Sequence, residues 1–88
     1  MVRVGIIGFG GMGRVHFEAY QKIDGVKVLA IADIDPQRAT KEGLKGYSDY
    51  RELLADKEID GVDVCTATPL HAEICTAALR GGKHVVCE

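Results

Sequence analysis

Glycine spacing near the N-terminus is the first feature of this sequence that could do chemistry. Residues 8–13 read GFGGMG, which fits the spacing G-x-G-x-x-G between an apolar run and a stretch of helical periodicity. In this pattern Gly8 permits a tight turn, Gly10 lets a pyrophosphate approach the backbone, and Gly13 lets the helix pack closely on the strand. The first-turn amides and the helix dipole would then hold the anion. The alternative is a turn that merely reverses the chain, and the surrounding elements favour a dinucleotide site.

A carboxylate further along the chain supports the same interpretation. Asp33 lies twenty residues after Gly13, at the end of the apolar run VKVLAIAD, where an acidic residue accepts hydrogen bonds from the adenosine ribose. Asp35 directly precedes Pro36 and is predicted to cap a helix instead. Because the charge of Asp33 would repel a 2′-phosphate, NAD is predicted in preference to NADP. Arg38 could reach such a phosphate, although its interpretation as a solvated helix residue is the stronger one.

Strands and helices are predicted to alternate around these residues. Nearly continuous apolar runs indicate strands buried on both faces. Crossovers of the observed length imply parallel pairing with right-handed connections, and hence a layered α/β sheet with helices on both sides. The predicted strands are residues 2–7, 26–33, 61–66 and 84–88, with a short edge strand at 44–48, and the predicted helices are 12–23, 36–43, 48–54 and 68–80.

Apolar periodicity predicts which face of each helix is buried. In the first helix Val15, Ala19 and Ile23 recur at i, i+4 and i+8, which indicates one stripe facing the sheet. Ser48 is the predicted N-cap of the third helix. The buried face of the last helix is predicted to contain Leu70, Ile74 and Ala78.

Composition narrows the class of protein. Eighty-eight residues make one domain at most, and 47% hydrophobic with 27% charged residues is ordinary for a globular fold. A net charge of −2 with scattered basic residues argues against nucleic acid and against a membrane surface. The apolar runs are strand-sized, no signal peptide is apparent, and the cysteines are odd in number without CxxC spacing, so a cytoplasmic protein is predicted.

Other reactive residues have simpler interpretations. His71 and Cys75 are four residues apart, but further ligands with convincing spacing are absent, so no metal site is predicted. His16 is expected to be a hydrogen-bonded structural residue. Ser48 is the only serine and is already needed as a cap, so a serine nucleophile is discounted. No catalytic residue is predicted.

Two stretches together carry a family resemblance. The segments GIIGFGGMGRVH and VLAIADIDPQRA at the front and TPLHAEICTAALRGGKHVVCE at the back resemble the N-terminal domain of the glucose-fructose oxidoreductase and inositol dehydrogenase family, Gfo/Idh/MocA. Members are NAD(P)-dependent oxidoreductases that act mostly on sugars and other polyols. The resemblance implies a three-layer Rossmann-type sheet, mostly parallel, with strand order 3-2-1-4-5 and residues 44–48 as the third strand. A reductase of the dihydrodipicolinate or homoserine-dehydrogenase type is the alternative family.

The resemblance also implies a set of cofactor-binding residues. Besides the three glycines above, Phe9, Gly11 and Met12 would meet the pyrophosphate, and Ile34 would join Asp33 at the adenosine. The path towards the nicotinamide would be formed by Thr66, Ala67 and Thr68, and Glu88 would be the glutamate of the family's Glu-Lys-Pro motif. His71 departs from the family spacing after its Thr-Pro pair, so a cofactor role for it stays open.

The sequence ends at Glu88, before the lysine of that motif, the last family strands and the substrate domain. We therefore expect residues 1–88 to be a single dinucleotide-binding domain that binds cofactor without turnover, and whether the chain is an enzyme stays open. A non-catalytic folding or assembly unit is the competing hypothesis. In that case Val85 and Val86 would lie on an unprotected sheet edge and favour a homodimer through that edge or by exchange of the last elements.

Overall fold

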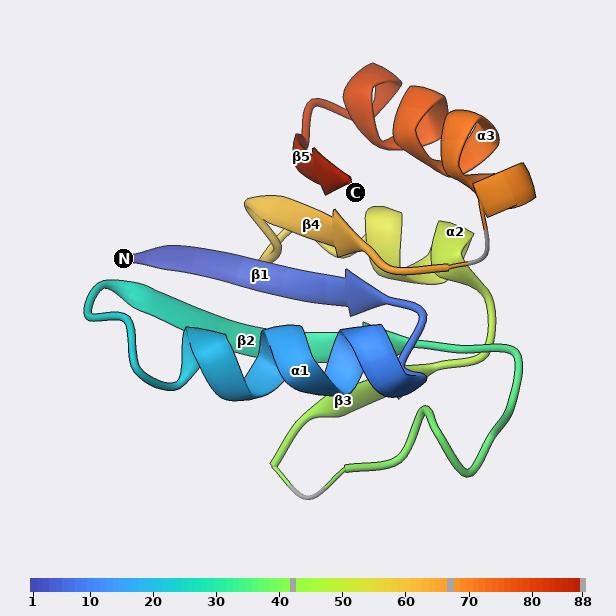
Figure 1. Cartoon of the computed structure of the whole chain (residues 1–88). Coiled ribbons are helices and arrows are strands. Elements are labelled where there is room, and N and C mark those ends of the chain that lie inside the picture. The colour runs from blue at the N-terminus through green and yellow to red at the C-terminus, as the bar shows by residue number, and fades with distance from the viewer. Residues whose placement is uncertain (42, 67, 88) are drawn as a thin grey trace.

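The computed structural model describes residues 1–41, 43–66 and 68–87, leaving aside the side chains of Thr68 and Cys87. Five strands form one sheet in the order β3-β2-β1-β4-β5, and every neighbouring pair is parallel (Figure 1). This confirms the predicted strand order and the α/β fold class. The strands are β1 (Val2–Ile7), β2 (Val26–Ala32), β3 (Lys45–Tyr47), β4 (Gly61–Val64) and β5 (His84–Cys87).

Helices cover both faces of this sheet. The helix α1 (Gly11–Tyr20) packs on one face, while α2 (Tyr50–Leu54) and α3 (Thr68–Arg80) pack on the other. Each parallel pair of neighbours in sequence is thus joined by a crossover, and the predicted three layers are present. No helix among the described residues is both long and apolar enough to cross a bilayer.

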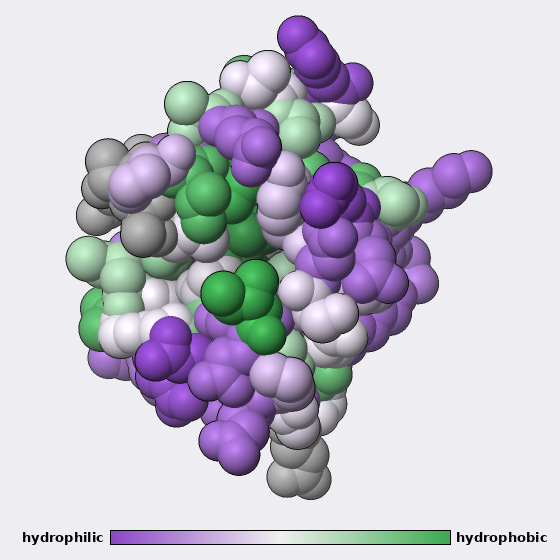
Figure 2. Space-filling view, turned by 90° about the vertical axis from the view of Figure 1, so that its right-hand side faces the viewer, coloured by the Kyte–Doolittle hydropathy of each residue, from purple (hydrophilic) through white to green (hydrophobic). Residues whose placement is uncertain are grey.

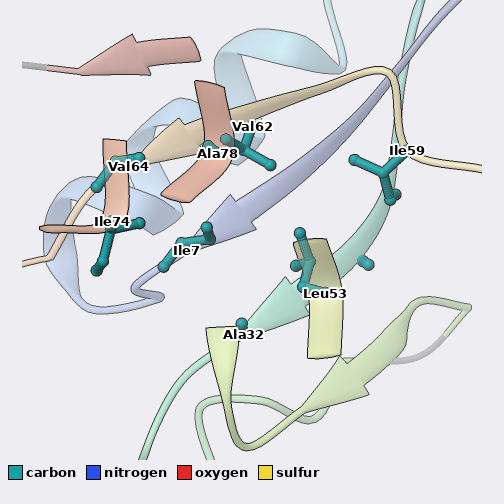
Figure 3. Packing of buried hydrophobic residues seen from close by; sticks show 9 residues of the cluster. Ile7, Ala32, Leu53, Ile59, Val62, Val64, Ile74 and Ala78 are labelled. Atoms are coloured by element: carbon teal, nitrogen blue, oxygen red, sulfur yellow. The ribbon is translucent and has the colours of Figure 1, made fainter. Parts of the chain in front are cut away.

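The core consists of two clusters of buried hydrophobic residues, and the larger one lies between the sheet and the helices α2 and α3 (Figure 3). Leu53 of α2 is fully buried there. Gly5 in the middle of β1 makes room for it, since a Cβ on Gly5 would lie 2.7 Å from Leu53 Cδ2. The buried members of this cluster are Ile7, Ala30, Ala32, Leu53, Ile59, Val62, Val64, Ile74 and Ala78.

The prediction of the buried face of α1 is wrong. Val15 is 63% exposed, and Ile23 lies beyond the end of the helix with 49% exposure. The face that contacts the sheet instead contains Gly13 together with Phe17 and Tyr20, which pack against the second core cluster of Ile6, Phe9, Val28 and Ile31. A helix that packs this close to the sheet needs a glycine at the contact. A search for apolar periodicity does not count glycine as an apolar residue, so it did not identify this face of the helix.

The helix predicted from Pro36 is a single turn over residues 36–39. Its start is capped as expected, because Asp35 Oδ1 accepts a 2.9 Å hydrogen bond from Gln37 N. The turn ends where the carbonyl of Ala39 lies against β3: a Cβ on Gly46 would be only 2.1 Å from Ala39 O. The predicted cap and edge strand are both present, and the helix between them is shorter than predicted.

The predicted N-cap of α2 is also wrong by one residue. Asp49 occupies that position in extended conformation, and its Oδ1 accepts a 2.9 Å hydrogen bond from Arg51 N. The carboxylate is the stronger acceptor at a helix start, where it also meets the positive end of the dipole. Ser48 lies one residue earlier, where its side chain is exposed. In the last helix Ile74 and Ala78 are buried as predicted, while Leu70 is 47% exposed.

Candidate functional site at the carboxyl edge of the sheet

A pocket of about 480 Å³ opens at the carboxyl ends of β1, β2 and β4. Figure 2 shows this side of the molecule, with apolar surface in the hollow and polar residues around it. The connection from β1 crosses one face of the sheet and the connection from β4 crosses the other, which makes this the topological switch point where α/β proteins bind ligands. Its walls are Ile7, Gly8, Gly10, Ala32, Asp33, Ile34, Arg38, Ser48, Asp49, Tyr50, Arg51, Cys65, Thr66, Leu70 and Ile74.

The glycine turn forms one wall because two of its positions accept no side chain. Gly8 has a φ of +92°, and a Cβ there would lie 2.9 Å from Cys65 C and Thr66 N. A Cβ on Gly13 would lie 2.2 Å from the carbonyl oxygen of Gly8. Gly10 is the N-cap of α1 and supplies no side-chain cap. Gly10 itself borders the pocket, and no side chain caps the backbone amides of the first turn that follows it.

Asp33 joins the glycine turn to the end of β2. Its Oδ2 accepts a 2.8 Å hydrogen bond from Phe9 N, and its Oδ1 accepts one of 2.9 Å from Asp35 N. Each carboxylate oxygen has two lone pairs, so each keeps acceptor capacity after these bonds. The two backbone bonds fix the carboxylate on the pocket wall, at the end of β2.

Two arginines bring positive charge to the same rim. The Nη1 of Arg38 lies 3.5 Å from the point that a Cβ on Gly10 would occupy, and its Nε lies 3.8 Å from Asp35 Oδ2. Arg51 Nε donates to Asp49 Oδ1 at 3.1 Å. The backbone N–H and the guanidinium of Arg51 hold the pKa of Asp49 below its usual value. The arginines thus border a pocket that also contains the fixed carboxylate of Asp33.

The residues after β4 form the opposite wall. Thr66 lies on this wall, and its buried Oγ1 has no hydrogen-bond partner among the described residues. The carbonyl oxygen of Thr66 contacts Nε2 of His71, which ties the first turn of α3 to the end of β4. The predictions for Ala67 and Glu88, and for the side chain of Thr68, lie outside the described part of the structure.

The structure brings together six of the predicted cofactor residues as walls of one pocket: Gly8, Gly10, Asp33, Ile34, Arg38 and Thr66. The described pocket walls do not include Phe9, Gly11, Met12 or Gly13. The ring of Phe9 is buried beneath α1, where it meets Phe17 edge to face at 5.9 Å. Phe9 therefore faces the site through its backbone N–H, which is bonded to Asp33.

Sequence reasoning missed the walls contributed by the other face of the sheet. These are residues 48–51 at the start of α2, together with Leu70 and Ile74 of α3; Cys65, whose side chain packs on the α1 face, was missed as well. A usable signal existed for the first group, because these residues follow the third strand, and the carboxyl ends of parallel strands meet at one edge. Leu70 and Ile74 resemble ordinary core positions in the sequence.

Comparison with known proteins agrees with this geometry. Residues 2–88 match the family described as "Oxidoreductase family, NAD-binding Rossmann fold". The chain belongs to the Gfo/Idh/MocA family. The myo-inositol 2-dehydrogenase of Thermotoga maritima is 40% identical over 92 aligned residues, which cover 99% of this chain and 28% of that enzyme.

Solved Gfo/Idh/MocA-like structures superimpose closely on the chain. The scyllo-inositol dehydrogenase of Lactobacillus casei, solved with NAD(H) and scyllo-inositol, has a TM-score of 0.91 at 28% identity and covers 99% of this chain and 27% of that one. A 3-ketoreductase from Actinomadura kijaniata, solved with NADP, has a TM-score of 0.91 at 33% identity, covering 98% of this chain and 29% of that one. The chain thus spans under a third of the length of these relatives.

Proposed function

We propose that residues 1–88 bind NAD in the pocket at the carboxyl edge of the sheet. The observation that carries this proposal is the carboxylate of Asp33, held on the pocket wall by Phe9 N and Asp35 N. The pyrophosphate would lie against the backbone of residues 8–13, with the adenosine ribose on Asp33 and the adenine side near Ile34 and Arg38. The nicotinamide half would run towards Thr66–Thr68 and Glu88.

Two features of the pocket support a dinucleotide rather than a general apolar ligand. The buried Thr66 Oγ1 has no partner within the described chain, so a polar ligand group would satisfy it. The glycine turn exposes backbone where side chains would otherwise fill the space. The residues of this chain would bind and orient the cofactor, and the bound nicotinamide would supply the hydride chemistry.

We propose NAD over NADP for an electrostatic reason. A 2′-phosphate on the adenosine ribose would lie close to the negatively charged carboxylate of Asp33. That carboxylate would repel the phosphate and has no hydrogen to donate to it. Arg38 lies close enough to the rim to offset part of this repulsion. The related 3-ketoreductase was solved with NADP, so we expect a preference for NAD and not an absolute exclusion of NADP.

We further propose that a whole protein of the relatives' length oxidises a sugar or polyol. Several similar proteins are named inositol 2-dehydrogenases. Since residues 1–88 span only 26–29% of the curated relatives, we expect these residues alone to bind the cofactor without turnover.

Replacing Asp33 tests the proposal. Asp33→Asn removes the charge and should raise the dissociation constant for NAD by about tenfold or more, as expected for lost hydrogen bonds to a charged group. NADP should lose less affinity, because the repulsion disappears with the charge. Asp35→Asn is the matched control, since Asp35 caps the next turn through Oδ1 and is not a pocket wall. Isothermal titration calorimetry measures both, with circular dichroism as the check on folding; a folded Asp33→Asn protein with unchanged NAD affinity would refute the assignment.

A second proposal concerns assembly. Among the described residues β5 pairs only with β4, and Val86 on this outer strand is 51% exposed. An unpaired edge with an exposed apolar side chain is a template for pairing with another strand. We propose that this edge joins two copies of the 88-residue chain in a symmetric dimer, and the experiment is given with the whole-molecule predictions below.

A further inference from the structure

Three side chains of types that bind metals meet on the α1 face of the sheet. They do not include His71 and Cys75, the pair considered in the sequence analysis. His16 comes from α1, Asp63 from β4, and Cys65 from the residue that follows β4. Their ligand atoms all lie within 4.8 Å of one another. His16 and Asp63 are not walls of the pocket described above. The cluster combines an imidazole nitrogen, a carboxylate oxygen and a sulfur. Along the sequence, His16 is 47 residues from Asp63 and 49 residues from Cys65.

The spacing of these atoms is near that of a tetrahedral metal site. His16 Nδ1 lies 2.6 Å from Asp63 Oδ2 and 3.5 Å from Cys65 Sγ, while Cys65 Sγ lies 3.3 Å from Asp63 Oδ1. Metal–ligand bonds of roughly 2.0–2.3 Å in a tetrahedron separate the ligand atoms by about 3.3–3.5 Å. The two contacts of sulfur already have this separation. With Asp63 Oδ2 as the ligand oxygen, it and His16 Nδ1 must move apart by ~0.7 Å, while the sulfur contact is to the other oxygen, Oδ1.

The charge of the cluster favours a cation. Asp63 is 1% exposed, and its hydrogen-bond donors among the described residues are His16, Cys65 and Tyr20, whose hydroxyl donates at 2.8 Å. No lysine or arginine of the described chain pairs with it, so the cationic partner present there is His16, when that imidazole is protonated. A buried carboxylate is costly without a matched positive charge. A divalent ion would supply that charge, and Tyr20 would remain as a hydrogen-bond donor that orients the ligand carboxylate.

The ligand atoms also select the kind of ion. Sulfur and imidazole ligands suit zinc and its chemical relatives, whereas magnesium and calcium prefer oxygen alone. The side chain of His16 is 16% exposed, so the cluster is not sealed from solvent. Binding requires the thiol of Cys65 to lose its proton to solvent, because the thiolate is the ligand form. It also requires Nδ1 of His16 to give up the hydrogen that it donates to Asp63, so that the imidazole binds the ion as the neutral tautomer with its hydrogen on Nε2.

We propose that His16, Asp63 and Cys65 form a site for a zinc-like divalent transition ion, with water completing the tetrahedron. This site would link α1 to β4 across the sheet face. The proposal goes beyond NAD binding and uses no bound dinucleotide, although Cys65, unlike His16 and Asp63, is also a wall of the pocket.

Titration of the purified 88-residue protein with Co²⁺, a coloured substitute for Zn²⁺, tests the proposal. We expect one equivalent to bind with a thiolate-to-cobalt charge-transfer band. Cys65→Ser should remove that band, and His16→Asn should weaken binding by about tenfold or more, while keeping a side chain that can donate to Asp63. Cys75→Ser on α3 is the matched control and should behave as wild type. A band that survives in Cys65→Ser, or vanishes in Cys75→Ser, would overturn the assignment, as would the absence of any band.

A second measurement uses the wild-type protein and so does not depend on whether variants fold. Zn²⁺ should slow alkylation of Cys65 relative to Cys75, with the labelled peptides separated by mass spectrometry. Equal protection of the two cysteines, or no protection of Cys65, would contradict the site.

Discussion

At the scale of single residues, missing side chains and one buried carboxylate position the pocket and the helix beside it. Gly13 and Gly8 are in contact through backbone atoms that a methyl group would separate. Asp63 of β4 is hydrogen-bonded to His16 and Tyr20 of α1, and these bonds attach the helix to the sheet. Gly8 therefore serves both as a wall of the pocket and as the contact for α1.

Gly13→Ala tests this close contact. The added Cβ would lie 2.2 Å from Gly8 O, so α1 must shift outward, and we expect a loss of about 1–3 kcal/mol or more in unfolding free energy. Gly11→Ala is the matched control in the same helical turn, because its Cβ would have no neighbour within 4 Å; it should be neutral or slightly stabilising. Urea denaturation followed by circular dichroism measures both. Equal midpoints for the two variants would contradict the role given to Gly13.

Tyr20→Phe tests the attachment to Asp63. The change removes the 2.8 Å hydrogen bond to a carboxylate that is 1% exposed. We expect the free energy of unfolding to fall by roughly 1.5–3 kcal/mol, as for a lost hydrogen bond to a charged group. Chemical denaturation gives this value directly, and an unchanged midpoint would mean that Asp63 does not need the hydroxyl.

At the scale of elements, a polar network adds to the apolar contacts between the short β3 strand and the α2 region. Asp56, just after α2, accepts hydrogen bonds from Glu58 N, Tyr47 Oη and Lys45 Nζ at 2.8–3.0 Å. Tyr47 and Lys45 belong to β3. The edge of the sheet beside the pocket is therefore stabilised by an ionised carboxylate.

This network predicts a specific response to acid. The backbone N–H of Glu58, the hydroxyl of Tyr47 and the ammonium of Lys45 lower the pKa of Asp56 from 3.8 to about 2. A lowered pKa means that the stabilisation is fully present above about pH 4 and is lost as the pH falls through 2. In Asp56→Asn, stability at neutral pH should be lower and its decline between pH 4 and pH 2 shallower. Thermal unfolding across that range measures this, with Asp24→Asn, an exposed carboxylate, as control; parallel pH profiles for wild type and Asp56→Asn would exclude the effect.

At the scale of the whole molecule, α1 covers one face of the sheet, and α2 and α3 cover the other. Among the described residues, the outer strand β5 pairs only with β4. The pocket lies where the two sets of crossovers diverge, so the cofactor site and the β5 edge occupy different parts of the molecule. Ligand binding and self-association can therefore be measured separately.

Val86→Lys tests association through β5. A lysine on an edge strand disfavours pairing with another strand, so the variant should be monomeric at concentrations where the wild-type chain dimerises. Leu79→Lys is the matched control, because Leu79 is 64% exposed on α3 rather than on the sheet edge; it should still dimerise. Light scattering after size-exclusion chromatography gives the masses. A wild-type chain that stays monomeric at high concentration, or a Val86→Lys protein that still dimerises, would rule out this edge.

The sequence by itself determined the parts of the protein that depend on local pattern. Apolar runs such as residues 26–32 specify buried strands, the glycine spacing specifies the turn after β1, and the distance to Asp33 specifies the carboxylate at the next strand end. These features need only neighbouring residues and the right-handedness of parallel crossovers. The strand order was implied by the family resemblance and not by these local features, and it was confirmed.

Only the tertiary structure decided which side chains meet across elements. Periodicity allows two stripes on α1, and close packing of Gly13 on the sheet selected Phe17 and Tyr20 over Val15. The turn after Asp35 ends where Ala39 packs against Gly46 of β3, and no local sequence pattern predicts this contact. The pocket walls from α2 and α3, and the meeting of His16 with Asp63 and Cys65, arise because distant segments pack into one layer. Such contacts depend on the distance between elements in space, and residue spacing along the chain does not encode that distance.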